Sequence, residues 1–194
     1  NGLAFLVIWE IMALTSFILV IFEHGRMETL KAGINYLIQS HISILFLTIG
    51  FIWAYVRSGS FVFSAIGSYA ASGNMGASIL LFFVFFTGFA IKAGFVPFHT
   101  WLPHAHPAAP SHISGVMSGV IIKTGIYGIL RMLLLVSSNP LVIGVVILVI
   151  SVITGVYGVM LATLQHNIKK LLAYHSIENI GIIGIGIGIG AIGK

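Results

Sequence analysis

Four charged side chains interrupt long apolar runs of this sequence. Glu10 lies within residues 2–22, Lys92 and Lys123 lie in two later runs, and Glu178 lies in the last run. At the centre of a membrane helix, each such group disfavours insertion by roughly 2.5–3.5 kcal/mol. Ionisable residues at such positions are by default functional, so these four are the first candidates for chemistry.

The chemistry that suits these groups is proton transfer. Burial disfavours the charged form of an amine, and a nearby carboxylate favours it. A lysine whose carboxylate partner approaches or withdraws can therefore take up and release a proton. Glu10 is the natural partner of Lys92, because both lie near the middle of their runs; their contact is a hypothesis. The other interpretations are structural ion pairs, or side chains long enough to reach the membrane surface.

Two further positions suit the onward transfer of a proton. Lys123 has no carboxylate in its own run, but Gly119 and Gly125 leave room beside it for water or another helix. His175 and Glu178 are three residues apart and so share a helix face. Histidine titrates near neutral pH, which suits a relay group, although a packing histidine is the other interpretation.

The stretch "HTWLPHAHPAAPSH" holds several histidines between two of the apolar runs. His99 and His112 are candidates for proton entry or relay. Metal binding is a weaker interpretation, because the spacing of His99, His104, His106 and His112 matches no recognised ligand pattern and no carboxylate is close in sequence. We therefore expect no metal site.

The composition indicates what surrounds these groups. Of 194 residues, 58% are hydrophobic and 7% charged, and the mean hydropathy is +1.11. A typical soluble domain is about 25% charged. The net charge of +5 is not gathered into a basic run, so we expect no nucleic-acid partner. The absence of cysteine excludes disulfides and Cys-ligated clusters within this sequence.

The elements that position these groups follow from the apolar runs. A helical span needs about 20 apolar residues. We predict an all-α, polytopic transmembrane helix bundle, a single membrane domain over residues 1–194 with about six spans. The predicted spans are 2–22, 35–56, 77–98, 111–136, 141–164 and 171–193.

Three local features refine this prediction. Pro97 removes a backbone N–H inside span 77–98, so we expect a kink or break just after Lys92. Residues 58–76 are too interrupted for a span and predict a short interfacial helix and loop. The tail "GIGIGIGIG" alternates with period two, but a lone strand in lipid leaves its backbone unsatisfied, so we predict a helix there.

Loop charges predict the topology. Arg26, Lys31, Lys169 and Lys170 are expected at one end of the bundle, and Arg57, Arg131 and Lys194 at the other. The small excess favours the first end as cytoplasmic. The sequence begins with Asn and shows no basic n-region, so we expect no signal peptide and interpret the chain as part of a longer protein.

Three blocks carry a resemblance to a known family. They are "KAGFVPFHTWLPHAHPAAPSH", "KTGIYGILR" and "AYHSIENIGII", in this order. Together they resemble the antiporter-like membrane subunits of the respiratory complex I superfamily. Within it, the chain is similar to the large membrane subunit (component B type) of hydrogenase-4 and formate hydrogenlyase complexes, from Glu10 to Gly190.

The resemblance implies a larger fold and a role for each charged group. That family has about fourteen helices with two inverted repeats, so the six spans would be its fifth to tenth helices. Glu10, Lys92 and Lys123 would match the glutamate and lysines of a hydrated proton path. His175 and Glu178 would match the variant of the tenth helix in the hydrogenase-like branch, with Lys123 passing the proton to them.

The function implied is proton translocation by one subunit of a redox-driven complex. Its expected partners are other membrane subunits, peripheral redox subunits and the lipid bilayer. The expected transported ion is the proton, and sodium is the alternative ion. We expect no cofactor in this chain, so an oxidoreductase activity would belong to the whole complex. We expect this complex in a prokaryotic plasma membrane. The alternatives are a subunit of a multi-subunit sodium/proton antiporter, and a structural membrane anchor without ion transport.

Overall fold

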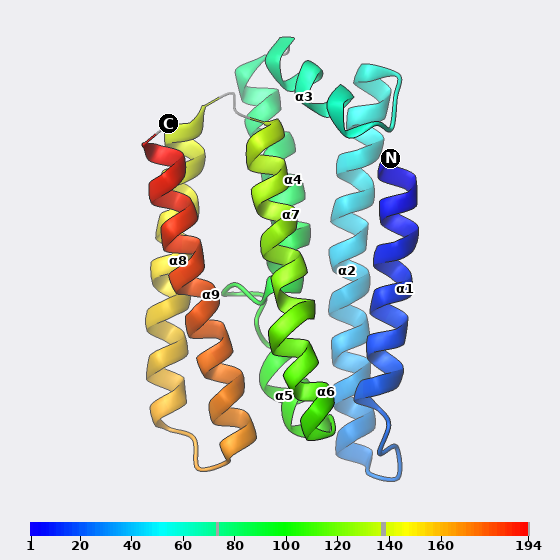
Figure 1. Ribbon diagram of the computed structural model, residues 1–194, viewed down its shortest axis with the longest axis vertical. Helices are drawn as coiled ribbons and strands as arrows, with labels where there is room; N and C mark the ends of the chain where they lie inside the picture. The colour runs from blue at the N-terminus through cyan, green and yellow to red at the C-terminus, as the bar shows by residue number, and fades with distance from the viewer. Residues whose placement is uncertain (73, 137–138, 194) are drawn as a thin grey trace.

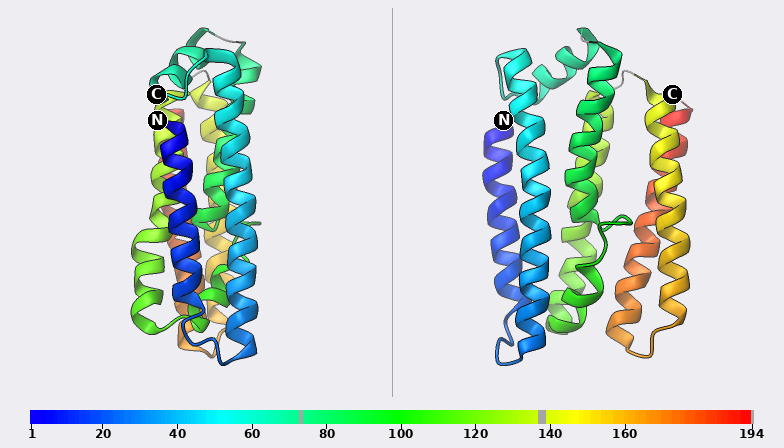
Figure 2. Two further views of the ribbon diagram at one scale, coloured as in Figure 1. Left: turned by 90° about the vertical axis from the view of Figure 1, so that its right-hand side faces the viewer. Right: turned by 180° about the vertical axis from the view of Figure 1, so that it is seen from behind.

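The long apolar runs form upright helices in the computed structural model, which describes residues 1–72, 74–136 and 139–193. The described residues contain helices and no strands. Within these residues, six helices or continuous helical segments are long and apolar enough to cross a membrane, at or near the predicted positions. They stand side by side as three pairs, with α4 and α7 between α1/α2 and α8/α9 (Figures 1 and 2). The helices are α1 (Gly2–Val20), α2 (Met27–Ser58), α3 (Phe63–Ser72), α4 (Met75–Ala93), α5 (Leu102–Ala108), α6 (Ser111–Val116), the π-helical turn η1 (Met117–Ile121), α7 (Ile122–Leu135), α8 (Pro140–Thr163) and α9 (Ile168–Ile192).

Two predicted boundaries differ from the structure by more than three residues. Helix α2 begins at Met27, eight residues before the predicted start, because the polar segment "METLKAG" continues the helix beyond the apolar run. Helix α4 ends at Ala93 rather than 98, because Gly94 adopts the left-handed conformation with φ of 82°. The break after Lys92 is confirmed, but Pro97 lies in the loop that follows, not inside the helix.

The glycine-rich tail is helical, as predicted, and its glycines let α9 approach α8 closely. A methyl group at Gly144 would lie 2.8 Å from the carbonyl oxygen of Gly188, and one at Gly188 would lie 2.9 Å from the amide nitrogen of Leu148. By contrast, Gly186 and Gly190 have no such neighbour within 4 Å. With this period-two pattern, every second glycine of the tail lies on the face of α9 that packs against α8, and the glycines between them lie off that face.

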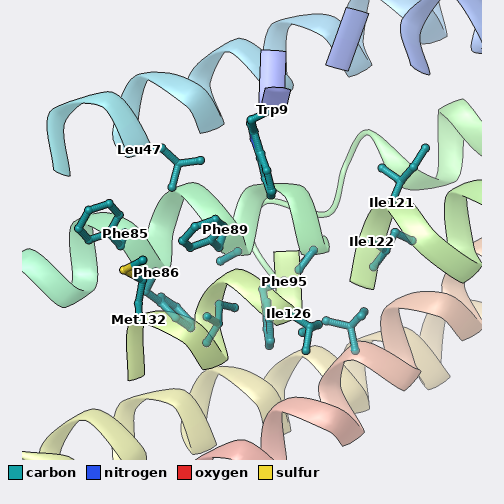
Figure 3. Close-up of a cluster of buried hydrophobic side chains, with 14 of the residues drawn as sticks. Trp9, Leu47, Phe85, Phe86, Phe89, Phe95, Ile121, Ile122, Ile126 and Met132 are labelled. Atoms are coloured by element: carbon teal, nitrogen blue, oxygen red, sulfur yellow. The ribbon is translucent and has the colours of Figure 1, made fainter. Parts of the chain in front are cut away.

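Helix α4 lies at the centre of the apolar core. Phe85 and Phe89 are fully buried and pack against aromatic rings of α1 and α2, including an edge-on contact of 5.4 Å between Phe89 and Trp9 (Figure 3). On the other side of α4, a methyl group at Gly125 of α7 would lie 2.8 Å from the amide nitrogen of Ala93. The helices that carry Lys92 and Lys123 thus touch within two residues of both lysines.

The expected gathering of basic residues at one end of the bundle is confirmed. Arg26, Lys31, Lys169 and Lys170 line one open cavity of about 720 Å³ where the α1–α2 loop, α5 and the start of α9 meet. This is the lower end of the bundle in Figure 1, opposite the end of α2 that carries Arg57. Lys194 lies outside the described residues. The predicted interfacial helix is α3, which lies across the upper end in Figure 1.

Candidate functional site

Lys92 lies in the last turn of α4, where the helix is interrupted. The final carbonyls of a helix have no partner within it and must find one elsewhere. Here the amides of Gly94 and Phe95 both donate to the carbonyl of Ala90, at 2.9 and 3.1 Å. The indole Nε1 of Trp101, returning from the loop, donates to the carbonyl of Ile91 at 2.9 Å. The break is therefore stabilised by its own hydrogen bonds, which fix the position of the lysine backbone.

The side chain of Lys92 is closed off from solvent and held by hydroxyl groups. The residue is 1% exposed. Its Nζ donates to the Tyr36 hydroxyl at 2.7 Å and to Ser40 Oγ at 3.3 Å, and it lies 4.6 Å from the centre of the Tyr36 ring. Within the described parts of the chain, no carboxylate oxygen lies within 4.0 Å of this amine.

Helix α2 supplies both of these partners from one face. Tyr36 and Ser40 are four residues apart, one turn of helix, and both are buried. The ring of Trp101 packs edge-on against Tyr36 at 5.2 Å. The tyrosine is thus fixed between the lysine and the indole that caps α4.

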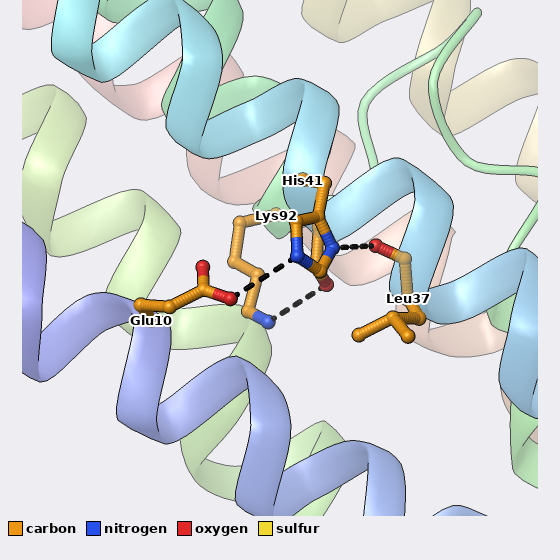
Figure 4. A network of polar contacts seen from close by, with 5 residues as sticks. Glu10, Leu37, His41 and Lys92 are labelled. Atoms are coloured by element: carbon orange, nitrogen blue, oxygen red, sulfur yellow. Dashed lines mark hydrogen bonds and ion pairs between the residues drawn. The ribbon is translucent and has the colours of Figure 1, made fainter.

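Glu10 does not contact Lys92 directly, contrary to the sequence hypothesis. Its Oε1 lies 3.2 Å from Nε2 of His41 on α2, and its Oε2 is buried with no hydrogen-bond partner among the residues that the structure describes. Figure 4 shows the Glu10 carboxylate reaching the His41 ring from α1, with the Lys92 side chain ending on α2 as well. Glu10 and Lys92 thus reach adjacent residues of α2, His41 and Ser40, instead of each other.

The loop that follows the break is tied to two other helices. The amide of Val96 donates to Thr154 Oγ1 of α8 at 3.2 Å, and Gln39 of α2 donates to Thr100 Oγ1 at 2.5 Å. His99 lies between these points, 7% exposed, with its ring edge-on to Tyr157 at 4.8 Å and its Nδ1 without a partner.

The other histidines of this region are separated. Nδ1 of the buried His106 lies 2.7 Å from Ser114 Oγ, whereas its Nε2 has no partner. His112 is exposed, and His104 lines the basic cavity at the lower end of the bundle. Among the residues that the structure describes, no three histidine or carboxylate side chains gather as metal ligands.

Lys123 has a different setting, just after the π-helical turn η1. A π-turn bonds residues five apart, here the amide of Ile122 to the carbonyl of Met117. The extra residue brings Lys123 level with Ser118, whose carbonyl accepts from Nζ at 3.1 Å. The lysine is exposed and lines a cavity of about 160 Å³ between α7 and α9.

The part of α9 that faces this cavity is not the predicted pair. Ser176, Asn179 and two isoleucines of α9 line it with Lys123. Each helical residue turns by about 100°, so His175 and Glu178 point about a third of a turn away. Among the described residues, no hydrogen bond or ion pair joins Lys123 to His175 or Glu178, between which proton transfer was expected.

His175 and Glu178 do form the pair that their spacing predicts. His175 Nδ1 lies 2.7 Å from Glu178 Oε2, and the backbone of Glu178 packs against Gly158 of α8. The two side chains are 48% and 25% exposed. This pair is thus a separate polar site, apart from the residues of α9 that line the cavity beside Lys123.

Several residues of the site do not stand out in the sequence. Tyr36, Ser40 and Thr154 are neutral and common in membrane helices, so nothing in their type set them apart. Their spacing was the feature that could have identified them. Tyr36 and Ser40 are four residues apart, so they form a polar pair on one face of a helix whose later turns are apolar. His41 was visible within its span, but its partner on α1 could not be read from one sequence.

Comparison with known proteins places the chain among membrane subunits. All of residues 1–194 match the family model described as NADH:quinone oxidoreductase/Mrp antiporter, transmembrane. The chain is 38% identical over 196 residues to hydrogenase-4 component B of Escherichia coli K12, covering 100% of this chain and 29% of that protein. It is 35% identical over 189 residues to formate hydrogenlyase subunit 3 of the same organism, covering 97% of this chain and 30% of that protein.

Solved structures share the fold. A chain of the Mrp complex from Dietzia sp. DQ12-45-1b superposes with a TM-score of 0.87 at 26% identity, covering 95% of this chain and 35% of that one. The chain thus spans about a third of the length of the relatives that it matches. The resemblance stated from the sequence motifs is confirmed, as is the polytopic membrane fold.

Proposed function

Because this chain belongs to the family of NADH:quinone oxidoreductase and Mrp antiporter transmembrane subunits, we propose that it carries part of a proton path in a redox-driven membrane complex. The complex would be of the hydrogenase, formate hydrogenlyase or NADH:quinone oxidoreductase type. The relatives named above are components of hydrogenase-4 and formate hydrogenlyase, which supports the hydrogenase branch.

The observation that carries this proposal is the setting of Lys92. A buried amine that is held only by hydroxyl groups and an aromatic ring is a poor structural ion, because no carboxylate offsets the loss of its hydration. The same features suit a site that gains and loses a proton. The adjoining helix break places loop backbone at this point of the bundle, where it can contact water or another polar group.

The proposed path uses the residues named from the sequence. Glu10 and Lys92 would form the first part, around α2, and Lys123 the next, where α7 touches α4. The cavity beside Lys123 points onward to Ser176 and Asn179 of α9. His175 and Glu178 would act at a separate step, and His99 and His112 would serve at entry or relay.

The remaining parts of the activity would belong to other subunits. We propose that peripheral redox subunits transfer the electrons and that other membrane subunits flank this chain in a prokaryotic plasma membrane. This chain would hold no cofactor of its own, so its contribution is to move protons in response to charge changes in its neighbours.

The second candidate function is exchange of sodium for protons in a multi-subunit antiporter. The observation that favours it is the close structural match to a chain of an Mrp complex. The third candidate, a structural anchor, predicts that the buried charges matter for assembly and not for transport.

A transport experiment separates the three functions. Coupled proton movement and the electron-transfer rate would be measured in vesicles that carry the full-length complex, with and without sodium, for the parent and for Lys123→Met. We expect sodium-independent proton movement that falls in the variant while the complex still assembles. Strict dependence on sodium would favour the antiporter, and parent-level proton movement in the variant, or loss of assembly alone, would favour the anchor.

A further inference from the structure

The His41 ring lies between two groups that fix where its protons are. Its Nδ1 lies 2.8 Å from the backbone carbonyl of Leu37, and its Nε2 lies 3.2 Å from Glu10 Oε1. A carbonyl oxygen only accepts, so Nδ1 must carry hydrogen. These contacts leave Nε2 and Glu10 to share whatever further proton the pair holds (Figure 4).

When the pair holds one shared proton, two protonation states satisfy both hydrogen bonds. Either Nε2 carries a proton and donates to an ionised Glu10, or Glu10 is protonated and donates to a neutral ring. Both states hold the same single proton between Glu10 and His41, and both have zero net charge. Release of that proton leaves a neutral ring, an ionised carboxylate and a net charge of −1.

The position of this pair makes its charge relevant to Lys92. The sequence contains four carboxylate side chains. Glu23 and Glu28 line the basic cavity at the lower end of the bundle, and Glu178 pairs with His175 on α9. Of these four carboxylates, Glu10 is the one that reaches the Lys92 region. Its partner His41 directly follows Ser40 on α2, and Ser40 accepts a hydrogen bond from the Lys92 amine.

The second His–Glu pair shows what is particular to the first. His175 and Glu178 belong to one helix, and His175 meets Glu178 through Nδ1. His41 is instead anchored by its own helix through one nitrogen and meets α1 through the other. Its protonation therefore depends on a contact between two helices, which a small relative movement of α1 and α2 would change.

We propose that Glu10 and His41 act as one proton-holding unit, and that proton loss from this unit, not from Glu10 alone, creates the negative charge beside the Lys92 site. This inference rests on the proposed function. In it, His41 is a working residue of the proton path, and Ser40, the residue before it on α2, holds the Lys92 amine together with Tyr36.

The test compares three variants of the full-length complex in vesicles: His41→Gln, Glu10→Gln and the double variant. Glutamine can still donate a hydrogen bond to Glu10 but does not titrate, so a merely structural bond would survive in His41→Gln. We expect each single variant to lower coupled proton movement by about tenfold or more, with normal assembly and electron transfer. The double variant should be no worse than either single one, because both remove the same unit.

The controls separate this inference from the proposed function. His24→Gln, in the exposed α1–α2 loop, should behave as the parent. Loss of proton movement in Glu10→Gln but not in His41→Gln would overturn the shared unit and leave the proposed function standing. Unchanged proton movement in Glu10→Gln, His41→Gln and Lys92→Met together would overturn the proposed function itself.

A spectroscopic measurement on the parent complex covers the case in which His41→Gln does not assemble. Infrared difference spectra during turnover would show the Glu10 carboxyl band, identified by its absence in Glu10→Gln. We expect this band to change together with imidazole bands. A carboxyl band that changes while the imidazole bands stay constant would overturn the proposal.

Discussion

The two intramembrane lysines have the same side chain and very different surroundings. Lys92 lies at the end of an interrupted helix, 1% exposed, and its hydrogen bonds go to side chains of another helix. Lys123 lies in a continuous helical segment, is exposed to a cavity, and bonds a carbonyl of its own helix. The helices that carry them touch at Gly125 and Ala93, while the two side chains reach different neighbouring helices.

This difference indicates a division of work on the proposed path. A closed site exchanges a proton only when a neighbouring group moves or changes charge, whereas a lysine beside an open cavity can exchange with water directly. Lys92 would therefore respond to the Glu10 and His41 unit, and Lys123 would pass protons on. The following substitutions test whether the structural difference between the two sites has this energetic meaning.

The largest contrast should come from replacing each lysine with methionine, which keeps its length and apolar shape. Lys92→Met removes a buried cation that lacks a carboxylate partner. We expect its free energy of unfolding to equal that of the parent or to exceed it by about 1–4 kcal/mol. Lys123→Met, at an exposed site, should stay within about 0.5 kcal/mol. Unfolding of the full-length subunit in lipid nanodiscs would measure both, and strong destabilisation by Lys92→Met would contradict the description of the closed site.

The contact between the two lysine-bearing helices can be disturbed at Gly125. A methyl group there would lie 2.7 Å from the carbonyl oxygen of Phe89 and 2.8 Å from the amide nitrogen of Ala93, so Gly125→Ala must push α7 away from α4. We expect a loss of about 1–3 kcal/mol. Gly119→Ala is the matched control, because no heavy atom lies within 4 Å of its added methyl group. Equal unfolding midpoints for the two variants would show that the contact is looser than described.

The hydroxyl that holds Lys92 should contribute measurably. Tyr36→Phe keeps the aromatic packing against Trp101 but removes the acceptor at 2.7 Å, which leaves the buried amine with Ser40. Loss of one partner of a buried polar group costs about 1–3 kcal/mol. Tyr127→Phe, at a residue that is 64% exposed, should have no effect within about 0.5 kcal/mol. Indistinguishable unfolding free energies would mean that the hydroxyl does not hold the amine.

The smallest expected effect concerns the loop after the break. Thr154→Val keeps the shape of the side chain but removes the oxygen that accepts from the Val96 amide at 3.2 Å. We expect a loss of about 1 kcal/mol and faster amide hydrogen exchange at Val96. Thr163→Val, at the exposed end of the same helix, serves as the control. Unchanged exchange at Val96 would exclude Thr154 as an anchor of the loop.

The fold could be predicted well from the sequence because apolar length decides it. Each long run became a span, and even the alternating glycine tail was helical. The errors fell where local backbone chemistry overrides composition. Gly94 ends α4 before Pro97 is reached, and the π-turn before Lys123 leaves no mark in the residue pattern.

The candidate site was predictable only in part. Charged residues in apolar runs are conspicuous, so Glu10, Lys92 and Lys123 were found directly, and the spacing of His175 and Glu178 correctly placed them on one face. Contacts between helices were not predictable, because one sequence does not say which faces meet. For that reason the hypothesis paired Glu10 with Lys92, whereas the structure pairs Glu10 with His41.

The most direct test of the account is the number of protons moved per electron in vesicles that carry the full-length complex with Lys92→Met. The closed lysine is the residue whose setting most strongly supports a proton path. We expect the number of protons moved per electron to fall by about tenfold or more, while assembly and the electron-transfer rate stay near the parent values. Parent-level proton movement in a fully assembled variant would contradict the assignment of Lys92 to the path.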